Sequence, residues 1–169
     1  MKIIEAMKRV KSNRQKINDL HKKIAQNSAH LSHEKSPYKN PTEQVAEWVQ
    51  SCLDLSQESA RLLVMIAKTN QETIVEIELG GKKVKKSIAE WIWRRREFAG
   101  LDRLAYDMLT DRNLTGGQMN ATVGDPIIVE IVRNFDAAER DKMVEMFASE
   151  PSEIDSALEV VNAVTDLVE

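Results

Sequence analysis

The stretch TIVEIELGGKKVKKSIAEW, residues 73–91, decides how this chain folds. Val75, Ile77 and Leu79 alternate with Glu76 and Glu78, which is the period of a strand with one buried face. Gly80 and Gly81 then supply a two-residue turn, where positive φ is required. A lysine-rich return strand follows, and the letters SIAE after it have the spacing of a helix capping box. We therefore predict that a β-hairpin, 73–86, interrupts a chain that is helical in pattern elsewhere.

The predicted hairpin needs further partners, because an isolated two-stranded ribbon is marginally stable in water. The segment PIIVEIVRNF, 126–135, has the composition of another strand. We expect a small antiparallel sheet of three strands, or one completed by a neighbouring molecule. Within the hairpin, Glu76 and Glu78 can pair across the strands with Lys83 and Lys85.

Upstream of the ribbon, residues 2–70 predict a long antiparallel helical hairpin with coiled-coil character. One core position repeats every seven residues and is occupied by Ile3, Val10, Ile17, Ile24 and Leu31. We assign the second core position to Met7, Arg14, His21 and Ser28. The second helix begins at Asn40 and Pro41, an N-cap followed by a first-turn proline. Its apolar stripe is Val45, Trp48, Val49, Cys52, Leu55, Leu62 and Ile66.

Downstream of the ribbon the chain returns to helical periodicity. The expected elements are a helix at 87–111, a loop at 112–125, a strand at 126–135 and C-terminal helices at 136–169, which break at Pro151. The whole pattern predicts one domain, 1–169, of the α+β class and predominantly helical.

Charge is distributed unevenly along the 169 residues, although the net charge is only −3. Residues 1–36 hold nine basic and three acidic residues, a net of +6, whereas 136–169 hold two basic and ten acidic residues, a net of −8. The two ends should attract each other, within one molecule or between copies. Cys52 is the single cysteine, so no disulfide can form within the chain.

The sequence also bears on location. No apolar run approaches the roughly 18 residues that a membrane helix needs. The first residues, MKIIEAMKRVK, lack the apolar core of a secretory signal. We expect synthesis in the cytoplasm and no membrane partner.

Basic residues cluster around two tryptophans after the glycine turn. The cluster comprises Lys82, Lys83, Lys85, Lys86, Arg94, Arg95 and Arg96, with Trp91 and Trp93 as potential stacking groups. This composition is typical of a nucleic-acid contact. The alternative is that the strand lysines pair with glutamates and the arginines form a solvated helix face. Both interpretations stay open on sequence alone.

Signals for catalysis are absent from the sequence. The GGKK letters lack the spacing of a phosphate loop, and no nucleophile or metalloprotease motif occurs. His30 and His33 are three residues apart but have no further ligands nearby, and a metal site needs three or four. We expect a protein that is not an enzyme and has no cofactor, metal or catalytic residues.

Three segments carry a family resemblance: IAKTNQET at 66–73, GGKKVKKSIAEWIWRRREFAGLDRLAYDML at 80–109 and EIDSALEVVNAVTDL at 153–167. In this order they resemble a family of small, uncharacterised helical proteins from bacteria and bacteriophages, some of which bear the name septicolysin. In the last segment Ala163 stands where the family usually has Trp. The bacteriophage members imply a role in a virion or its assembly, and the septicolysin name implies a lytic toxin.

From these observations we predict a structural or assembly protein that forms a homo-oligomer through helices. We expect it to be a decorating, connector or minor capsid-associated component of a bacteriophage virion. Its partners would be further copies and other virion proteins. The candidate interaction residues are the heptad Ile3, Val10, Ile17, Ile24 and Leu31, and the cluster Lys83, Lys85, Trp91, Trp93, Arg94, Arg95 and Arg96. A nucleic-acid-associated protein is the first alternative, and a lytic toxin is a less favoured second.

Overall fold

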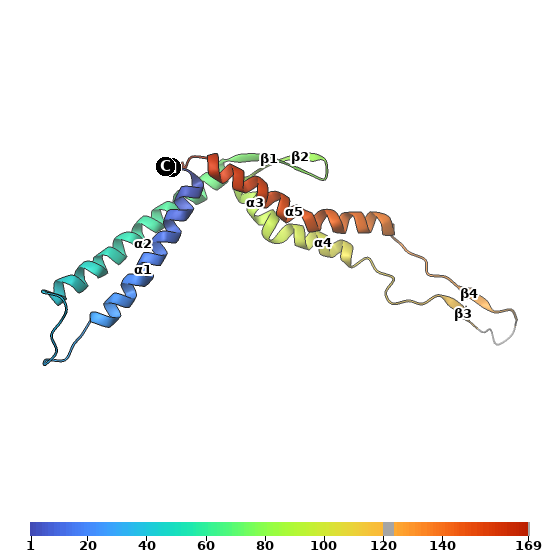
Figure 1. Cartoon of the computed structure of the whole chain (residues 1–169). Coiled ribbons are helices and arrows are strands. Elements are labelled where there is room, and N and C mark those ends of the chain that lie inside the picture. The colour runs from blue at the N-terminus through green and yellow to red at the C-terminus, as the bar shows by residue number, and fades with distance from the viewer. Residues whose placement is uncertain (120–123, 169) are drawn as a thin grey trace. The chain divides into compact units, whose positions relative to one another are not determined.

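The protein is an α+β protein in which helices predominate, as the sequence predicts (Figure 1). The computed structural model describes residues 1–119 and 124–168. Its elements are α1 (Ile3–Asn27), α2 (Pro41–Glu72), β1 (Ile74–Leu79), β2 (Lys82–Ser87), α3 (Ile88–Trp93), the π-helix η1 (Arg94–Phe98), α4 (Ala99–Asp107), β3 (Gly117–Met119), β4 (Ile127–Val129) and α5 (Ala137–Val164).

Contacts divide the chain into two compact units. Unit 1 comprises Met1–Val75, Ser87–Ala89 and Leu158–Glu169, and unit 2 comprises Glu76–Lys86 and Glu90–Ala157. The prediction that the chain behaves as a single domain stays a prediction. Across the described residues, no helix is both long enough and apolar enough to cross a membrane.

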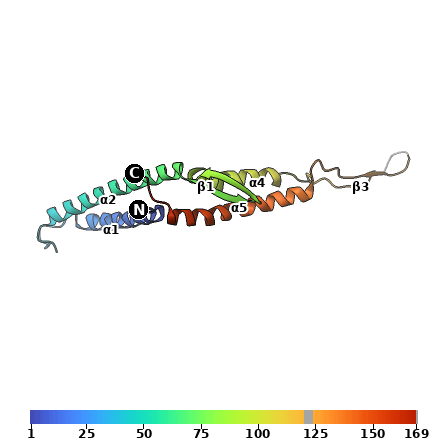
Figure 2. The same cartoon turned by 90° about the horizontal axis from the view of Figure 1, so that it is seen from above.

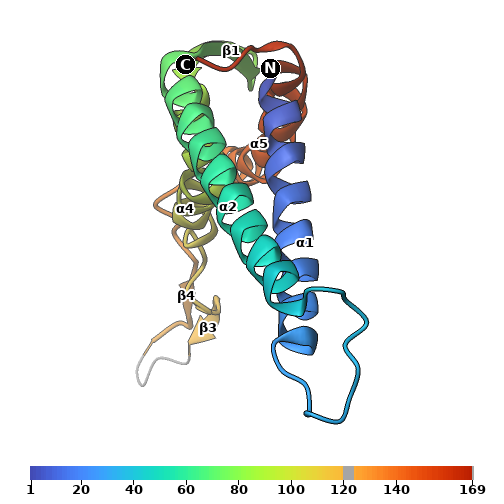
Figure 3. The same ribbon diagram turned by 90° about the vertical axis from the view of Figure 1, so that its left-hand side faces the viewer.

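In unit 1, α1 and α2 lie side by side and form the predicted helical hairpin (Figure 3). Ile3 and Val10 of the predicted heptad are buried, and Ile17 and Ile24 are half-buried. Leu31 lies beyond the end of α1 and is 60% exposed. The heptad therefore packs against α2 of the same chain.

The second core position of α1 differs from the prediction by one residue. Ala6 and Asn13 are fully buried, whereas Met7 and Arg14 are exposed. The physical reason is that core positions alternate in steps of three and four, and here the step of three follows each isoleucine or valine. The buried side of α2 has the same spacing and adds Ser59 and Thr69, two polar residues that the apolar stripe had omitted.

The two chain ends meet in unit 1, as their charges predict. Ile3 N donates to the Thr165 carbonyl at 3.0 Å, and Leu167 N donates to the Met1 carbonyl at 2.9 Å. Lys2 Nζ lies 2.7 Å from a carboxylate oxygen of Asp166. Leu167 packs on the cluster that α1 and α2 form between them. The C-terminal residues thus close the open end of the hairpin.

Unit 2 contains the glycine turn and most of α5. Both glycines of the turn have positive φ, +55° at Gly80 and +77° at Gly81, as the predicted hairpin requires. The side chain of Met146, on α5, lies against Gly80. Tyr106 on α4 and Phe147 on α5 have ring centroids 5.9 Å apart, and the two helices run alongside each other (Figure 2).

The predicted helix break at Pro151 is wrong, because α5 continues through this proline. An internal proline removes one backbone hydrogen bond and crowds the carbonyl four residues earlier. Here Glu150 and Ile154 on either side are both buried, so packing holds the helix together across the proline. The predicted helix 87–111 also departs from regularity, since η1 separates α3 from α4.

The third strand of the predicted sheet is placed elsewhere. β4 covers only Ile127–Val129 of the predicted 126–135 strand, and it pairs antiparallel with β3, which lies in the predicted loop. The chain thus has two separate two-stranded sheets among its described residues, β1–β2 and β3–β4. Sequence periodicity identified a strand here but not its partner, because pairing depends on where a loop turns back. The rest of the predicted 112–125 loop includes 120–123, which lie outside the described residues.

Candidate interaction surfaces

Arg94 is the centre of an ion-pair network inside unit 2. It begins η1, and its Nε and Nη2 donate to the two carboxylate oxygens of Glu150 at 2.5 and 2.9 Å. Its Nη1 also donates to Asp102 on α4. The guanidinium carbon lies 5.4 Å from the centroid of the Phe147 ring. Arg94 therefore joins η1, α4 and α5, and little of its charge is left for another molecule.

Electrostatics agree with this geometry. The hydrogen bond to Glu150 is the largest influence that raises the pKa of Arg94 above its ordinary value, and Asp102 adds to it against the cost of burial. The Glu150 side chain is 5% exposed and that of Arg94 is 20% exposed. A carboxylate this deeply buried needs a cation and hydrogen bonds to remain favourable. The pair is thus a packing feature of unit 2.

Most of the other predicted basic residues also have partners within the unit. Lys83 and Lys85 lie 3.6 and 3.5 Å from the carboxylate of Glu76, one of the two glutamates in the predicted cross-strand pairing. Arg95 pairs with Asp155 of α5. Among the described residues, exposed Lys82 and Arg96 form no ion pair. Carboxylates of the chain itself therefore neutralise part of the basic cluster.

The two tryptophans occupy opposite environments. Trp91 is 1% exposed, and Lys86 Nζ lies 5.8 Å from its ring centroid, so this side chain belongs to the core. Trp93 is 56% exposed. Of the two predicted stacking groups, only Trp93 can reach another molecule without unfolding the unit.

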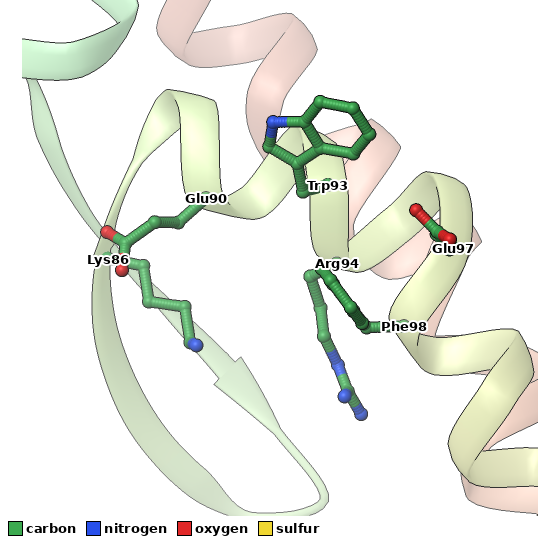
Figure 4. Close-up of a pocket in the computed structure, with 6 residues that line it drawn as sticks. All are labelled: Lys86, Glu90, Trp93, Arg94, Glu97 and Phe98. Atoms are coloured by element: carbon green, nitrogen blue, oxygen red, sulfur yellow. The ribbon is translucent and has the colours of Figure 1, made fainter.

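Trp93 borders an open hollow of about 560 Å³ on unit 2 (Figure 4). Its lining residues are Lys86, Glu90, Trp93, Arg94, Glu97 and Phe98. Cations, carboxylates and aromatic rings thus alternate around it, and no single charge dominates. The described residues contain no group of three or more histidine, cysteine or acidic side chains placed to hold a metal ion. The lining of the hollow is therefore mixed in chemistry.

Polar side chains also occur inside the helical hairpin. Asn13 Nδ2 donates to Glu58 Oε2 at 2.8 Å and to Ser59 Oγ at 3.3 Å. The other Asn13 atom, Oδ1, is buried without a hydrogen-bond partner among the described residues. Arg9 Nε lies 3.0 Å from the same Glu58 carboxylate, and its hydrogen bond is the largest influence that lowers the pKa of Glu58. A polar layer of this kind fixes the register of two paired helices.

An exposed apolar stripe of unit 1 lies on α2, on a different side of the helix from α1. Val49, Leu53, Leu63 and Val64 are between 41% and 69% exposed. They belong to a face of exposed residues that we name the outer face of α2: Ala46, Val49, Gln50, Leu53, Ser56, Gln57, Ala60, Leu63, Val64 and Ala67. None of these residues is charged. An uncharged helix face with apolar side chains exposed over this length is a candidate interaction surface.

Sequence reasoning missed this face, although the signal was present. Ala46, Val49, Leu53, Ala60 and Leu63 follow heptad spacing of their own, one residue after the stripe that packs against α1. Small residues at several positions made the second repeat inconspicuous. Val49 had been assigned to the core stripe, whereas it is exposed and belongs to the outer face.

Unit 2 has a second exposed apolar stripe. Trp93, Phe98, Leu101, Leu104 and Met108 are between 47% and 67% exposed and follow one another along α3, η1 and α4. The stripe begins at the hollow, whose lining includes its first two residues. The chain therefore exposes apolar helix surface on each of its two units.

Comparison with known proteins yields one structural likeness. No family model and no curated protein matches the sequence. The fold is similar to a crystal structure of a functionally unknown conserved protein from Corynebacterium diphtheriae, with a TM-score of 0.57, 19% identity and coverage of 99% of each chain. At this identity the likeness concerns the fold alone.

Proposed function

We propose that this protein is a structural or assembly protein without enzymatic activity, and that its copies associate through helices. The outer face of α2 is the observation that carries the proposal. It is long and uncharged, and all of its residues are exposed to solvent in a single molecule. Soluble monomers seldom leave a continuous apolar surface of this kind open.

Burial of the outer face contributes free energy toward association. Fully burying a leucine or valine side chain contributes about 1.5 to 3 kcal/mol. Leu53 at 58% exposure and Val64 at 69% have more than half of that contribution still to gain. The exposed valines and leucines of the face number four in each copy, so their burial in a dimer supplies several kcal/mol. The free-energy cost of bringing two molecules together is of similar size.

The contacts of the predicted α1 heptad favour the outer face of α2 over α1 as the proposed assembly surface. Ile3 and Val10 are buried within the chain, so α1 cannot use them to hold a second copy. The outer face of α2 has no such internal partner among the described residues. Self-association through helices thus remains the proposal, with α2 in place of α1 as the helix that carries it.

A nucleic-acid-associated role has less support. Arg94, Arg95, Lys83 and Lys85 all contact carboxylates of their own chain. Binding of a phosphate by Arg94 would require its ion pair with the buried Glu150 to open. The resemblance to proteins of bacteria and bacteriophages supports a virion or its assembly as the setting, and this part of the proposal rests on that resemblance alone.

The test is the solution mass, measured by light scattering over a hundredfold range of protein concentration and at low and high salt. We expect an oligomer that persists at about 1 M salt, where charge interactions are screened within about 3 Å. A monomer under every condition would overturn the proposal. Fluorescence titration with duplex DNA over the same salt range tests the alternative, since phosphate contacts give a steep salt dependence.

A matched pair of variants ties the mass to the proposed surface. Leu53→Arg puts a charge in the middle of the outer face, and we expect it to shift the mass to that of the monomer. Ser51→Arg introduces the same charge at an exposed position of α2 outside that face. It should leave the mass unchanged. Equal effects of the two variants would contradict a role for the outer face.

A further inference from the structure

We infer that a second copy of this chain binds the outer face of α2 with its own α2 antiparallel, about a two-fold axis at the level of Glu58. This inference rests on the proposed function, and it adds the partner, the direction and the register. A two-fold contact uses the same patch on both molecules, so the patch must be complementary to itself. The outer face fulfils this requirement because most of its residues are apolar and none is charged.

Side-chain size on the outer face allows close approach. Ala46, Ser56, Ala60 and Ala67 alternate with larger residues along α2. Small residues let two helix backbones come near each other, and larger ones then fill the space between them. Gln50 and Gln57, the two glutamines of the outer face, can form hydrogen bonds along the edge of such a contact. The face is thus built for a helix, rather than for a flat or irregular partner.

Charges on α2 select the antiparallel direction. One column of residues beside the outer face holds Glu47 and Asp54 in the first half of the helix and Arg61 and Lys68 in the second half. An antiparallel copy brings the acidic half of each column to the level of the basic half of the other, whereas a parallel copy aligns like charges. Antiparallel helix dipoles also attract. Salt partly screens both effects, because they act over distances comparable with the Debye length of about 10 Å. They therefore determine the relative direction of the two helices more than the affinity between them.

Heptad geometry then gives the register. In an antiparallel pair the two kinds of core position face each other across the contact. With the axis at the level of Glu58, Leu53 faces Leu63 of the second copy and Val49 faces Ala67 of the second copy. Ser56 and Ala60 meet near the axis. In the same arrangement Asp54 lies at nearly the same level along the helix pair as Arg61 of the second copy, in agreement with the charge pattern.

Disulfide trapping between single-cysteine variants tests the register. In a Cys52→Ala background, which removes the native thiol, Leu53→Cys and Leu63→Cys are prepared separately, mixed and oxidised with diamide. Disulfides require Cα atoms within about 7 Å. In the proposed register the mixture forms a covalent heterodimer. Leu53→Cys alone forms none, because two copies of position 53 are separated by about 15 Å along the axis at 1.5 Å per residue.

Each outcome decides the matter. Crosslinking of Leu53→Cys with itself, in a protein that is oligomeric by mass, overturns the antiparallel inference and leaves the proposed function intact. An oligomer that gives no crosslink in any combination places the contact on another surface and also overturns it. A monomer overturns the proposed function itself. Ser51→Cys, outside the face, is the control for random collision and should give no crosslinked species.

A second measurement covers the case in which a cysteine within the contact weakens assembly. Gln50 lies at the edge of the outer face, and a spin label there leaves the leucines in place. For the proposed axis we expect two labels in a dimer to lie about 24 Å apart along the helices, from 1.5 Å per residue. A parallel pair would place them about 10 Å apart, the spacing of packed helices.

Discussion

Arg94 and Glu150 join the π-helix η1 to α5 at the residue directly before the internal proline of α5. Arg94 opens the π-helix η1, and Glu150 immediately precedes Pro151 within α5. The two side chains form a bidentate ion pair, with bonds of 2.5 and 2.9 Å. On the other side of the proline, Asp155 pairs with Arg95. Successive arginines of η1 thus hold α5 on both sides of its proline.

We expect Arg94→Met to destabilise the protein strongly, by about 3 to 5 kcal/mol, because it leaves the buried Glu150 carboxylate without its cation. The measurement is the free energy of unfolding in urea. Arg96→Met is the matched control: Arg96 is exposed and forms no ion pair among the described residues, so its loss should change stability by about 0.5 kcal/mol or less.

The double variant Arg94→Met, Glu150→Met should recover much of this loss, since an apolar pair of similar size avoids the unpaired charge. Urea unfolding of the wild type, both single variants and the double variant gives the coupling energy. Additive effects would show that the two residues act independently, contrary to the ion pair described.

Asn13→Leu should raise the free energy of unfolding, by about 1 kcal/mol or more. The variant removes a buried Oδ1 that has no partner and adds apolar surface to the seam. Glu58 keeps its bond from Arg9, and Ser59 Oγ keeps its bond to the Leu55 carbonyl. Asn13→Asp has nearly the same shape but places a carboxylate against that of Glu58. It should be destabilising, and thermal unfolding will separate the two.

Gly80→Ala and Gly81→Ala should both destabilise the β1–β2 hairpin, by about 1 to 2 kcal/mol, because each residue has positive φ. A Cβ at Gly80 would lie 2.9 Å from Met146 Sδ, whereas one at Gly81 would meet nothing within 4 Å. Gly80→Ala should therefore be the worse of the two. Combining it with Met146→Ala should abolish the difference, and equal stabilities of the single variants would contradict the contact.

The ion pair between Lys2 and Asp166 should make stability depend on acid pH. The hydrogen bond from Lys2 is the largest influence that lowers the pKa of Asp166 below its ordinary value of 3.8. Because the native pKa is the lower one, the unfolded state takes up the proton first as the pH falls. The contribution is therefore complete well above pH 3.8 and is lost as the pH falls through the native value.

Asp166→Asn should accordingly be less stable than the wild type at pH 7, and the difference should shrink at low pH. Urea midpoints measured from neutral to acidic pH will show whether the curves converge. Glu145→Gln is the control, since Glu145 is exposed and forms no ion pair among the described residues. A constant gap between Asp166→Asn and the wild type would contradict the linkage.

Local patterns predicted most of the elements. The glycine turn, the two strands around it and the start of α3 were predictable because positive φ and strand periodicity depend on adjacent residues. The helical hairpin was predictable from the heptad that begins at Ile3. The second core position lies at Ala6, one residue before the predicted Met7. The sequence gives no clear apolar signal for this position, because a small alanine occupies the core and arginine or histidine follows one residue after later core positions.

Several features could not be found by local patterns. Pro151 normally ends a helix, and it does not do so here because Glu150 and Ile154 are held in the core of unit 2. The strand at Ile127 pairs with β3 rather than with β2. In the candidate site, sequence composition identified the basic residues but could not show that Glu150, some 56 positions after Arg94, neutralises one of them.

The sequence by itself determined the class of the fold, the helical hairpin, the glycine ribbon and the attraction between the two charged ends. These follow from periodicity, turn chemistry and net charge, which are properties of neighbouring residues or of the chain as a whole. Only the tertiary structure decided which apolar stripe is used internally and which remains exposed. That choice depends on side chains far apart in sequence competing for the same partner: α1 covers one heptad of α2, and the outer face, from Ala46 to Ala67, is left open to water.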